Sequence, residues 1–320
     1  MFALTLYGQN APAEVAAQQG DGIYSLLKRN GLQPNQFNAF VELNKDRLGR
    51  NNSLIAGRKY KLPTSATPAA PAAVGNSQVY RIFGPKYQQV TIRSNQLKGA
   101  TYYLKSGHGG PDPGATSRYE NHLLCEDEYA YDVVLRLGRN LIENGATVHF
   151  IVIDPNDGIR DQQFLAPDKD EVCYPKLTIP LNQVQRLKQR TDAINKLYNQ
   201  NRGGFHRMIS VHVDARSKGQ NIDVFFYHDE RSKTGAKTAS ILKNTFEAKY
   251  RQHQPNRGYR GTVSDRNLYV VRNSIPVSVY IELGNIHHSR DQQRIINPAN
   301  RQALANWLTD GLIQDFKTNP

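Results

Sequence analysis

Short apolar runs alternate with longer stretches of helical periodicity through most of the chain. The runs are rich in β-branched and aromatic residues, as strands are, and they cover Gln89–Ile92, Ala100–Leu104, Val148–Ile153, Met208–Val213, Val224–Tyr227, Leu268–Val271 and Val277–Leu283. Apolar residues recur at helical spacing over Glu126–Asn144, Pro180–Asn199, Lys233–Tyr250 and Arg301–Asp315. Strands and helices interspersed in this way predict the α/β class, with a mixed twisted sheet flanked by helices.

A smaller module is predicted over residues 18–63. Apolar side chains between Ile23 and Leu27 fall at helical spacing, and Gly31 is placed to end that helix. A second helix is expected after Pro34, and residues 54–63 alternate toward a short strand.

Two further segments set the predicted domain boundaries. Residues 64–78 are mostly Ala, Pro and small polar residues, which cannot build a core and predict an extended linker. The larger domain then spans residues 79–320. Residues 1–17 are interpreted either as the remnant of a secretory signal or as an ordinary N-terminus, and the sequence leaves both open.

The composition restricts the classes of function. The 320 residues include 41 Lys and Arg against 28 Asp and Glu, a formal net charge of +13, which favours an anionic partner. The basic residues are scattered and carry no nucleic-acid-binding motif, so no nucleic acid is expected. A polyanionic polymer of the cell envelope explains the charge equally well, as does a merely soluble surface. There is no run of about 18 apolar residues to span a membrane. Cys125 and Cys173 can pair, but no CxxC pattern predicts a thiolate metal site.

One histidine lies in a loop too rich in glycine to cover it. His108 falls within Ser106–Ala115, directly after a predicted strand. Glycines on both sides allow positive φ and the close approach of a ligand. A histidine presented in this way suits a metal site better than a core.

An acidic residue opens the first long helix. Glu126 lies in its first turn, where an acid is also stabilised by the helix dipole by about 0.3–1 kcal/mol. Glu120 and Glu128 are rival ligands on the same grounds.

Two later strands carry polar groups that such a site needs. In the strand Met208–Val213, Ser210 and His212 point away from the apolar face. Glu282 lies in a strongly apolar strand, where an acid is costly to bury without a partner or a chemical task. Burial raises the pKa of a carboxylic acid, which suits a general base near neutrality. A structural histidine and a salt bridge to arginine are the respective alternatives.

In this order the motifs of the larger domain resemble those of zinc-dependent N-acetylmuramoyl-L-alanine amidases of bacterial cell walls. The family's Gly-His-Gly-Gly-x-Asp-Pro-Gly-Ala motif matches Gly107–Ala115, and its long helix from Glu to Gly matches Glu126–Gly145, which selects Glu126 over its rivals. Three further motifs occur in family order, at Leu187, Arg190 and Asn195, at Ser210, His212 and Ala215, and at Glu282 and Gly284.

The resemblance implies that His108, Glu126 and His212 bind one Zn²⁺ ion and that Glu282 is the catalytic carboxylate. Two imidazoles and one carboxylate leave an open position on the metal, where water can be acidified. The family hydrolyses the amide between N-acetylmuramic acid and L-alanine, so peptidoglycan is the implied substrate, with its stem peptide in the catalytic cleft. The chain departs from the family at Lys105-Ser106, where Asp-Pro is usual, and the missing Asp can weaken support for a ligand.

Residues 18–63 resemble a LysM module, with a Gly-Asp opening, two helices, an Asn after the second and a Gly-x-x-Tyr-x-Leu-Pro ending. This resemblance implies a βααβ order and binding to glycan strands that contain N-acetylglucosamine. Together the two resemblances predict a secreted or periplasmic peptidoglycan amidase associated with the cell wall. A peptidase that cuts within the stem peptide and a non-catalytic peptidoglycan-binding protein are the alternatives.

Overall fold

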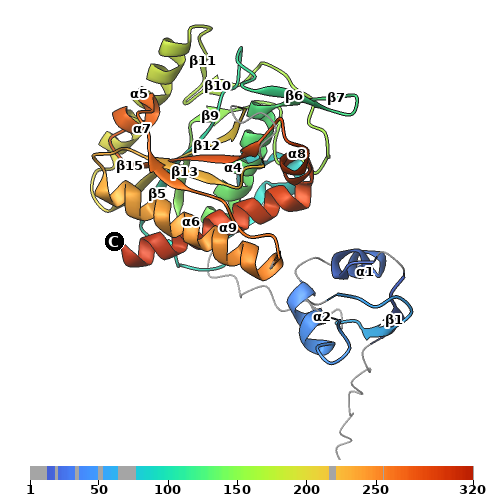
Figure 1. Ribbon diagram of the computed structural model, residues 1–320. Helices are drawn as coiled ribbons and strands as arrows, with labels where there is room; N and C mark the ends of the chain where they lie inside the picture. The colour runs from blue at the N-terminus through green and yellow to red at the C-terminus, as the bar shows by residue number, and fades with distance from the viewer. Residues whose placement is uncertain are drawn as a thin grey trace, which may run out of the picture. The chain divides into compact units, whose positions relative to one another are not determined.

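The computed structural model describes residues 13–18, 21–32, 36–49, 53–63, 77–215, 221–254 and 256–319. They form two compact units that divide between Ala72 and Ala73 (Figure 1). The predicted N-terminal segment and the predicted linker lie mostly outside the described residues.

The smaller unit has the order β1 (Glu14–Ala16), α1 (Ile23–Arg29), α2 (Phe37–Leu43) and β2 (Lys59–Lys61). The two strands pair antiparallel. Its own core contains Ala17, Ile23, Leu26, Leu27, Phe40, Tyr60 and Leu62. The predicted βααβ order is therefore confirmed.

Asn44 connects the second helix of this unit to its second strand. The side chain is buried, and Nδ2 donates to the carbonyls of Phe40 and Lys61, each at 2.8 Å. Its Oδ1 accepts from the amide of Lys61 at 2.7 Å. Asn44 thus supplies a donor and an acceptor to the backbone of β2, which also pairs with β1.

The larger unit is built on a six-stranded sheet in the order β14-β13-β15-β12-β5-β8. In chain order its strands are β5 (Ala100–Ser106), β8 (Thr147–Phe150), β12 (Phe205–Asp214), β13 (Phe225–His228), β14 (Val263–Asp265) and β15 (Val277–Asn285). Strands β8, β5, β12 and β15 are parallel, whereas β13 pairs antiparallel with β15. The sheet is mixed, as predicted.

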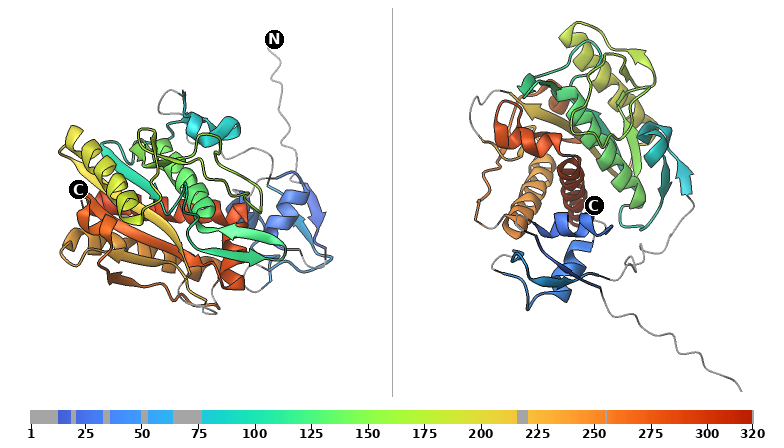
Figure 2. Two further views of the ribbon diagram at one scale, coloured as in Figure 1. Left: turned by 90° about the horizontal axis from the view of Figure 1, so that it is seen from above. Right: turned by 90° about the vertical axis from the view of Figure 1, so that its right-hand side faces the viewer.

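Helices cover both faces of this sheet (Figure 2). Each face has its own apolar cluster. One cluster packs against the long helices α4 (Glu126–Glu143), α6 (Lys233–His253) and α9 (Pro298–Thr318). The other packs against α5 (Gln183–Gln200) and α7 (Tyr269–Asn273). Side chains alternate between the faces of a strand, so Ile209 and Val211 of β12 join the first cluster and Met208 joins the second.

Shorter elements surround the sheet. They are β3 (Ser77–Val79), α3 (Gly84–Tyr87), β4 (Gln89–Thr91), the hairpin β6 (Thr116–Tyr119) and β7 (His122–Cys125), the three-stranded sheet of β9 (Val152–Ile153), β10 (Val172–Cys173) and β11 (Leu177–Thr178), and α8 (Ser289–Ile296).

One strand prediction was wrong. The run Leu268–Val271 lies at the start of the short helix α7, and its side chains Val270 and Val271 pack with Ile194 and Leu197 of α5. A short apolar run has no periodicity that separates a strand from a buried helical turn. The face of the sheet that carries the second cluster is covered by α5, and α7 packs beside α5 in the same layer.

Candidate metal centre

Three distant parts of the chain meet at the carboxyl ends of β5 and β12. His108 follows β5, Glu126 is the first residue of α4, and His212 lies near the end of β12. One ligand atom of each lies within 4.8 Å of those of the other two. Nε2 of His108 is 3.3 Å from Oε2 of Glu126, and Nδ1 of His212 is 2.9 Å from Oε1. The three residues predicted as metal ligands are therefore brought together.

The donor set fits a zinc ion. Zinc binds nitrogen and oxygen at about 2.0–2.1 Å, so neighbouring ligands of a tetrahedral site lie about 3.3 Å apart. The two nitrogen-to-oxygen distances from Glu126 are near that value, although each goes to a different oxygen: 3.3 Å from Nε2 of His108 to Oε2, and 2.9 Å from Nδ1 of His212 to Oε1. Two neutral imidazoles and one carboxylate leave one corner of a tetrahedron for water or substrate.

Glycines keep the space around these ligands clear. A Cβ on Gly107 would overlap the imidazole of His212, and a Cβ on Gly114 would lie 2.6 Å from Cδ2 of His108. Gly114 also has φ +70°, and His108 itself has φ 56°, which is uncommon for a residue with a side chain. The glycine-rich sequence is thus required by close approach as well as by backbone conformation.

His108 is held from two sides. Its Nδ1 lies 2.8 Å from Oδ2 of Asp112, whose carboxylate also pairs with Arg186 at 2.6 Å. Arg190 donates to the backbone carbonyl of His108 at 2.6 Å. Such contacts orient a ligand and fix which ring nitrogen is available. Burial lowers the pKa of His108, but the carboxylates of Asp112 and Glu126 outweigh it and raise that pKa to about 9. The carboxylates of Asp112 and Glu126 therefore favour a positive charge at this position.

His212 lies in a tighter environment. Its ring stacks on Tyr280 with centroids 4.1 Å apart, and its Nε2 is 3.1 Å from Nζ of Lys105. Burial and the nearby Lys105 lower the pKa of His212 to about 3. At neutral pH this imidazole is uncharged, which is the form that binds a metal.

Lys105 stands where the family that the motifs resemble usually has aspartate. It is fully buried, and its amine also contacts Oγ of Ser210 at 3.2 Å. Burial, with the charge of Arg190, lowers the pKa of Lys105 well below its usual range. The predicted departure therefore brings an amine to Nε2 of His212 where a carboxylate was expected.

Glu126 is fixed by backbone amides as well as by the two imidazoles. Its oxygens accept from the amides of Ala115 at 3.0 Å and Val213 at 3.1 Å. Burial raises the pKa of Glu126, but His108 and His212 outweigh it and hold the pKa well below its usual range. The carboxylate is ionised as a ligand must be, and its place at the start of α4 also suits the helix dipole.

Glu282 is placed one strand away from the triad. It pairs in register with His212 across the parallel strands β12 and β15, so both side chains leave the sheet on the same face. It is buried, and its charge acts on Lys105. It is not among the residues that line the cleft described next.

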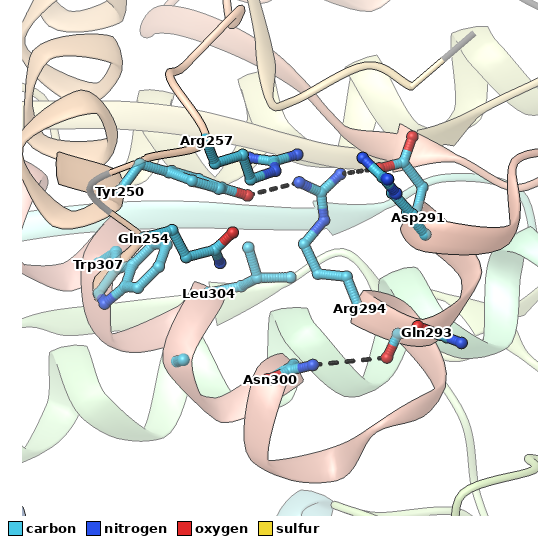
Figure 3. Close-up of a pocket in the computed structure, with 11 residues that line it drawn as sticks. Tyr250, Gln254, Arg257, Asp291, Gln293, Arg294, Asn300, Leu304 and Trp307 are labelled. Atoms are coloured by element: carbon cyan, nitrogen blue, oxygen red, sulfur yellow. Dashed lines mark hydrogen bonds and ion pairs between the residues drawn. The ribbon is translucent and has the colours of Figure 1, made fainter. Parts of the chain in front are cut away.

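A cleft of about 180 Å³ opens beside the imidazoles, between the sheet and the helices α5 and α7. Its lining includes Lys105, His108, His212 and Tyr280 from the sheet side, and Arg186 and Arg190 from α5. A larger cavity of about 430 Å³ lies elsewhere, between α6, α8 and α9, where Arg294 reaches Tyr250 and Asp291 (Figure 3). That cavity contains none of the predicted site residues.

Two arginines of α5 support the site: Arg186 was missed by sequence reasoning, and Arg190 was named only as a motif residue without a role. Arg186 lies one helical turn before Arg190, and both reach the loop of His108. Asp112 follows His108 by four residues in the same glycine-rich loop, and this spacing indicates that its carboxylate can contact the imidazole of His108. Asn195, the last residue of its motif, instead ties α5 to the end of α7, through Asn273 and Ile275.

The rival acids have other surroundings. Glu120 lies with φ 52° in the turn between β6 and β7. Glu128 pairs with Arg160 at 2.7 Å and is not within the triad. Cys125 and Cys173 are both buried free thiols.

Residues 103–314 match the family described as N-acetylmuramoyl-L-alanine amidase, Amidase_3. The chain belongs to this family. The matched region contains the triad and Glu282, so the site lies inside the amidase domain.

Relatives of known name agree with the family. The probable cell wall amidase LytH of Staphylococcus aureus is 27% identical over 225 residues, which are 69% of this chain and 60% of that protein. The chain thus spans about 60% of the length of the curated relatives it matches.

Solved structures share the fold of the amidase domain. The N-acetylmuramoyl-L-alanine amidase of Clostridium difficile 630 has a TM-score of 0.51 at 18% identity, covering 70% of this chain and all of that one. The CwlD amidase of Clostridioides difficile, solved with the GerS lipoprotein, has a TM-score of 0.51 at 14% identity, covering 69% of this chain and all of that one. Among the helices that the structure describes, none is both long and apolar enough to cross a membrane.

Proposed function

We propose that this chain hydrolyses the amide bond between N-acetylmuramic acid and the L-alanine of the peptidoglycan stem peptide. The observation that carries the proposal is the convergence of His108, Glu126 and His212 at one end of the sheet, inside a domain of the amidase family. The cleft beside them is the place for the stem peptide.

In this proposal the three side chains hold one zinc ion. When bound, zinc would polarise the scissile carbonyl and make water more acidic. The chain's own contribution is to present Nε2 of His108, a carboxylate oxygen of Glu126 and Nδ1 of His212 at ligand spacing. Asp112 and Arg190 keep His108 in position for this task.

Glu282 is assigned the proton transfers. It accepts a proton from the attacking water and delivers it to the amine of L-alanine as the amide breaks. Its support is its place in register with His212, on the face of the sheet that carries the site.

The smaller unit is assigned the glycan. We infer a LysM-like module that binds glycan strands of peptidoglycan, because its sequence motif and its βααβ order agree. The net charge of +13 suits a polymer rich in carboxylates. A substrate of this kind places the protein outside the cytoplasmic membrane, secreted or periplasmic.

Mass spectrometry of digested peptidoglycan tests the reaction. An amidase releases stem peptides with a free L-alanine amino terminus and leaves intact N-acetylmuramic acid in the glycan. New amino termini within the stem would instead identify a peptidase. Binding to sacculi without any release would identify a non-catalytic binder.

Elemental analysis of the purified protein tests the metal. The expected result is one zinc per chain, with loss of activity in a chelator and recovery on adding zinc. Full activity of a protein that contains no divalent metal would contradict the proposed role of the triad.

A further inference from the structure

A second group of acidic side chains lies beside the start of α4, separate from the zinc triad. Asp127, Glu128 and Glu171 bring carboxylate oxygens within 4.8 Å of one another. Asp154, Asp168 and Glu171 do the same, so Glu171 belongs to both triads. Four of the five are buried, and Asp168 is partly buried. We call these five residues the acidic cluster.

One oxygen of the acidic cluster lacks a partner although it is enclosed. The side chain of Asp127 is 2% exposed. Its Oδ1 accepts from the amide of Glu128 at 2.9 Å, whereas Oδ2 has no hydrogen-bond donor among the described residues. A buried carboxylate oxygen without a partner is costly. The cost disappears if a cation occupies the space between the carboxylates.

The nearby basic side chain does not balance the charge. Arg160 pairs with Glu128 at 2.7 Å and with Asp157, which lies outside the cluster. Among the described residues, the other four members of the acidic cluster form no ion pair with lysine or arginine. Burial raises the pKa of Glu171 to about 7, and the charges of Glu128 and Asp154 add to the effect. The cluster is therefore short of positive charge in a protein that is strongly basic overall.

We propose that the acidic cluster binds a calcium ion, with Glu171 and Asp127 as ligands. Its donors are all carboxylate oxygens, and hard cations prefer oxygen whereas zinc sites usually include nitrogen or sulfur. Calcium takes about six to eight oxygen ligands in flexible geometry, and these are often carboxylates. Magnesium needs nearly ideal octahedral geometry and is usually held by only one or two carboxylates, so a group of this many protein carboxylates favours calcium.

The calcium ion would join the two parts of the chain that form the acidic cluster. Asp127 and Glu128 are in the first turn of α4, and the other members come from the segment 154–171. Oε2 of Glu171 also accepts from the amide of Gly110 at 2.6 Å. The site is thus one hydrogen bond from the glycine loop that presents His108, and its ion stabilises that loop together with the segment 154–171.

Calcium stoichiometry and thermal stability test the proposal without reference to amidase activity. The 320-residue chain is stripped with a chelator, reloaded with one equivalent of zinc and titrated with calcium chloride. The expected result is one calcium per chain by elemental analysis after dialysis. The melting temperature should rise by about 5 °C or more at calcium concentrations a hundredfold above Kd.

Two substitutions identify the ligands. Glu171→Gln removes a charge shared by both triads and keeps an oxygen that can accept from Gly110. Asp127→Asn keeps an oxygen for the amide of Glu128. Both variants should lose the bound calcium and the calcium-dependent rise in melting temperature, while the melting temperature without calcium stays equal or increases because repulsion is relieved.

Asp170→Asn is the matched control. This exposed aspartate lies next to Glu171 and accepts from Asn156, but it is not in the cluster. It should retain calcium binding. The proposal is overturned if the zinc-loaded wild-type protein retains no calcium, if Glu171→Gln and Asp127→Asn bind calcium as the wild type does, or if magnesium produces an equal rise at equal concentration.

Discussion

At the scale of single residues, the space beside the proposed zinc ligands decides which residue can occupy position 107. A Cβ at this position would overlap the ring of His212, and the backbone there is not in the left-handed region. The effect of Gly107→Ala is therefore steric. The Cβ would lie 2.3 Å from Nδ1 of His212, so the imidazole has to move by about 1 Å to reach an ordinary contact distance. This displacement should lower zinc affinity by at least about 10–100-fold, the scale known for lost supporting contacts.

Competition with a chromogenic chelator measures this zinc affinity. Gly22→Ala is the control, because a Cβ there meets open space. Unchanged zinc affinity in Gly107→Ala would show that His212 can move without loss, and would count against its role as a ligand.

Glu282 is separable from the metal, since it is not part of the triad. Glu282→Gln keeps the size of the side chain and removes its basicity. If Glu282 moves the proton, release of stem peptides should fall by about 10²–10⁴-fold, while zinc content stays at one per chain. Stem-peptide release is measured from new L-alanine amino termini.

The control for this prediction is Glu230→Gln, an exposed glutamate beyond β13. Glu230→Gln should leave both stem-peptide release and zinc content unchanged. An activity of Glu282→Gln within a few-fold of the wild type would remove Glu282 from the proposed mechanism.

The residues proposed to bind the metal could be predicted because they lie in short motifs. His108, Glu126 and His212 were identified in this way and are adjacent in space. The contacts that α5 makes with the glycine loop could not be predicted, because they depend on how the helix lies over that loop. The ion pair between Asp112 and Arg186 joins residues 74 positions apart, and no local pattern encodes it.

At the scale of elements, the long helices and most of the strands were predicted, whereas several short elements were not. The predicted helix over 126–144 corresponds to α4, because an apolar stripe and Gly145 define its length. The segment over 268–271 was assigned as a strand and is α7. The helix α8 and the hairpin of β6 and β7 were not predicted, since neither is long enough to show a period.

The segment 154–180 is tied to the domain in part through Asp161. Its carboxylate accepts from Lys86 and Tyr87, each at 2.5 Å, and from Arg136 at 3.1 Å. Burial alone would raise the pKa of Asp161, but these donors lower it to about 2. The unfolded chain has a value of about 3.9, so the folded state holds the charge more strongly.

The sign of the pH dependence follows. A carboxylate with a lowered folded pKa contributes stability that is fully present above about pH 4 and is lost as the pH falls toward 2. Asp161→Asn should therefore destabilise the protein at pH 7, by no more than about 1 kcal/mol because Asp161 is partly exposed. The difference from wild type should shrink as the pH falls from 4 to 3.

Urea unfolding at several pH values measures this difference. Asp192→Asn, which removes an exposed pair with Lys188, is the control and should change stability by less than about 0.5 kcal/mol at any pH. A difference for Asp161→Asn that stays constant from pH 7 to pH 3 would show that its ion pairs do not stabilise the segment.

At the scale of the whole molecule, two units with separate cores divide the proposed work. The smaller unit has its own apolar cluster, and the larger unit has two, one on each face of its sheet. A unit with its own core can fold alone. Binding to glycan and hydrolysis of the stem peptide should therefore be separable by cutting the chain between them.

A fragment of residues 77–320 provides the test. On a soluble muropeptide it should hydrolyse the amide at the rate of the full chain, within about twofold, because the site lies entirely in the larger unit. On intact sacculi its rate should fall by at least tenfold. A tethered module raises the effective concentration of the catalytic domain near its substrate, and the gain from two linked sites reaches about 10²–10⁴-fold.

Asn44→Ala in the 320-residue chain separates the loss of glycan binding from the shortening of the chain. It removes the hydrogen bonds that join α2 to β2 and leaves the larger unit untouched. Loss of buried polar contacts of this kind costs about 1–3 kcal/mol each, enough to unfold a module of this size. The variant should then resemble the fragment, slow on sacculi and normal on the soluble substrate. If both proteins instead digest sacculi as fast as the wild type, the smaller unit does not hold the enzyme on glycan, and its resemblance to LysM modules carries no function here.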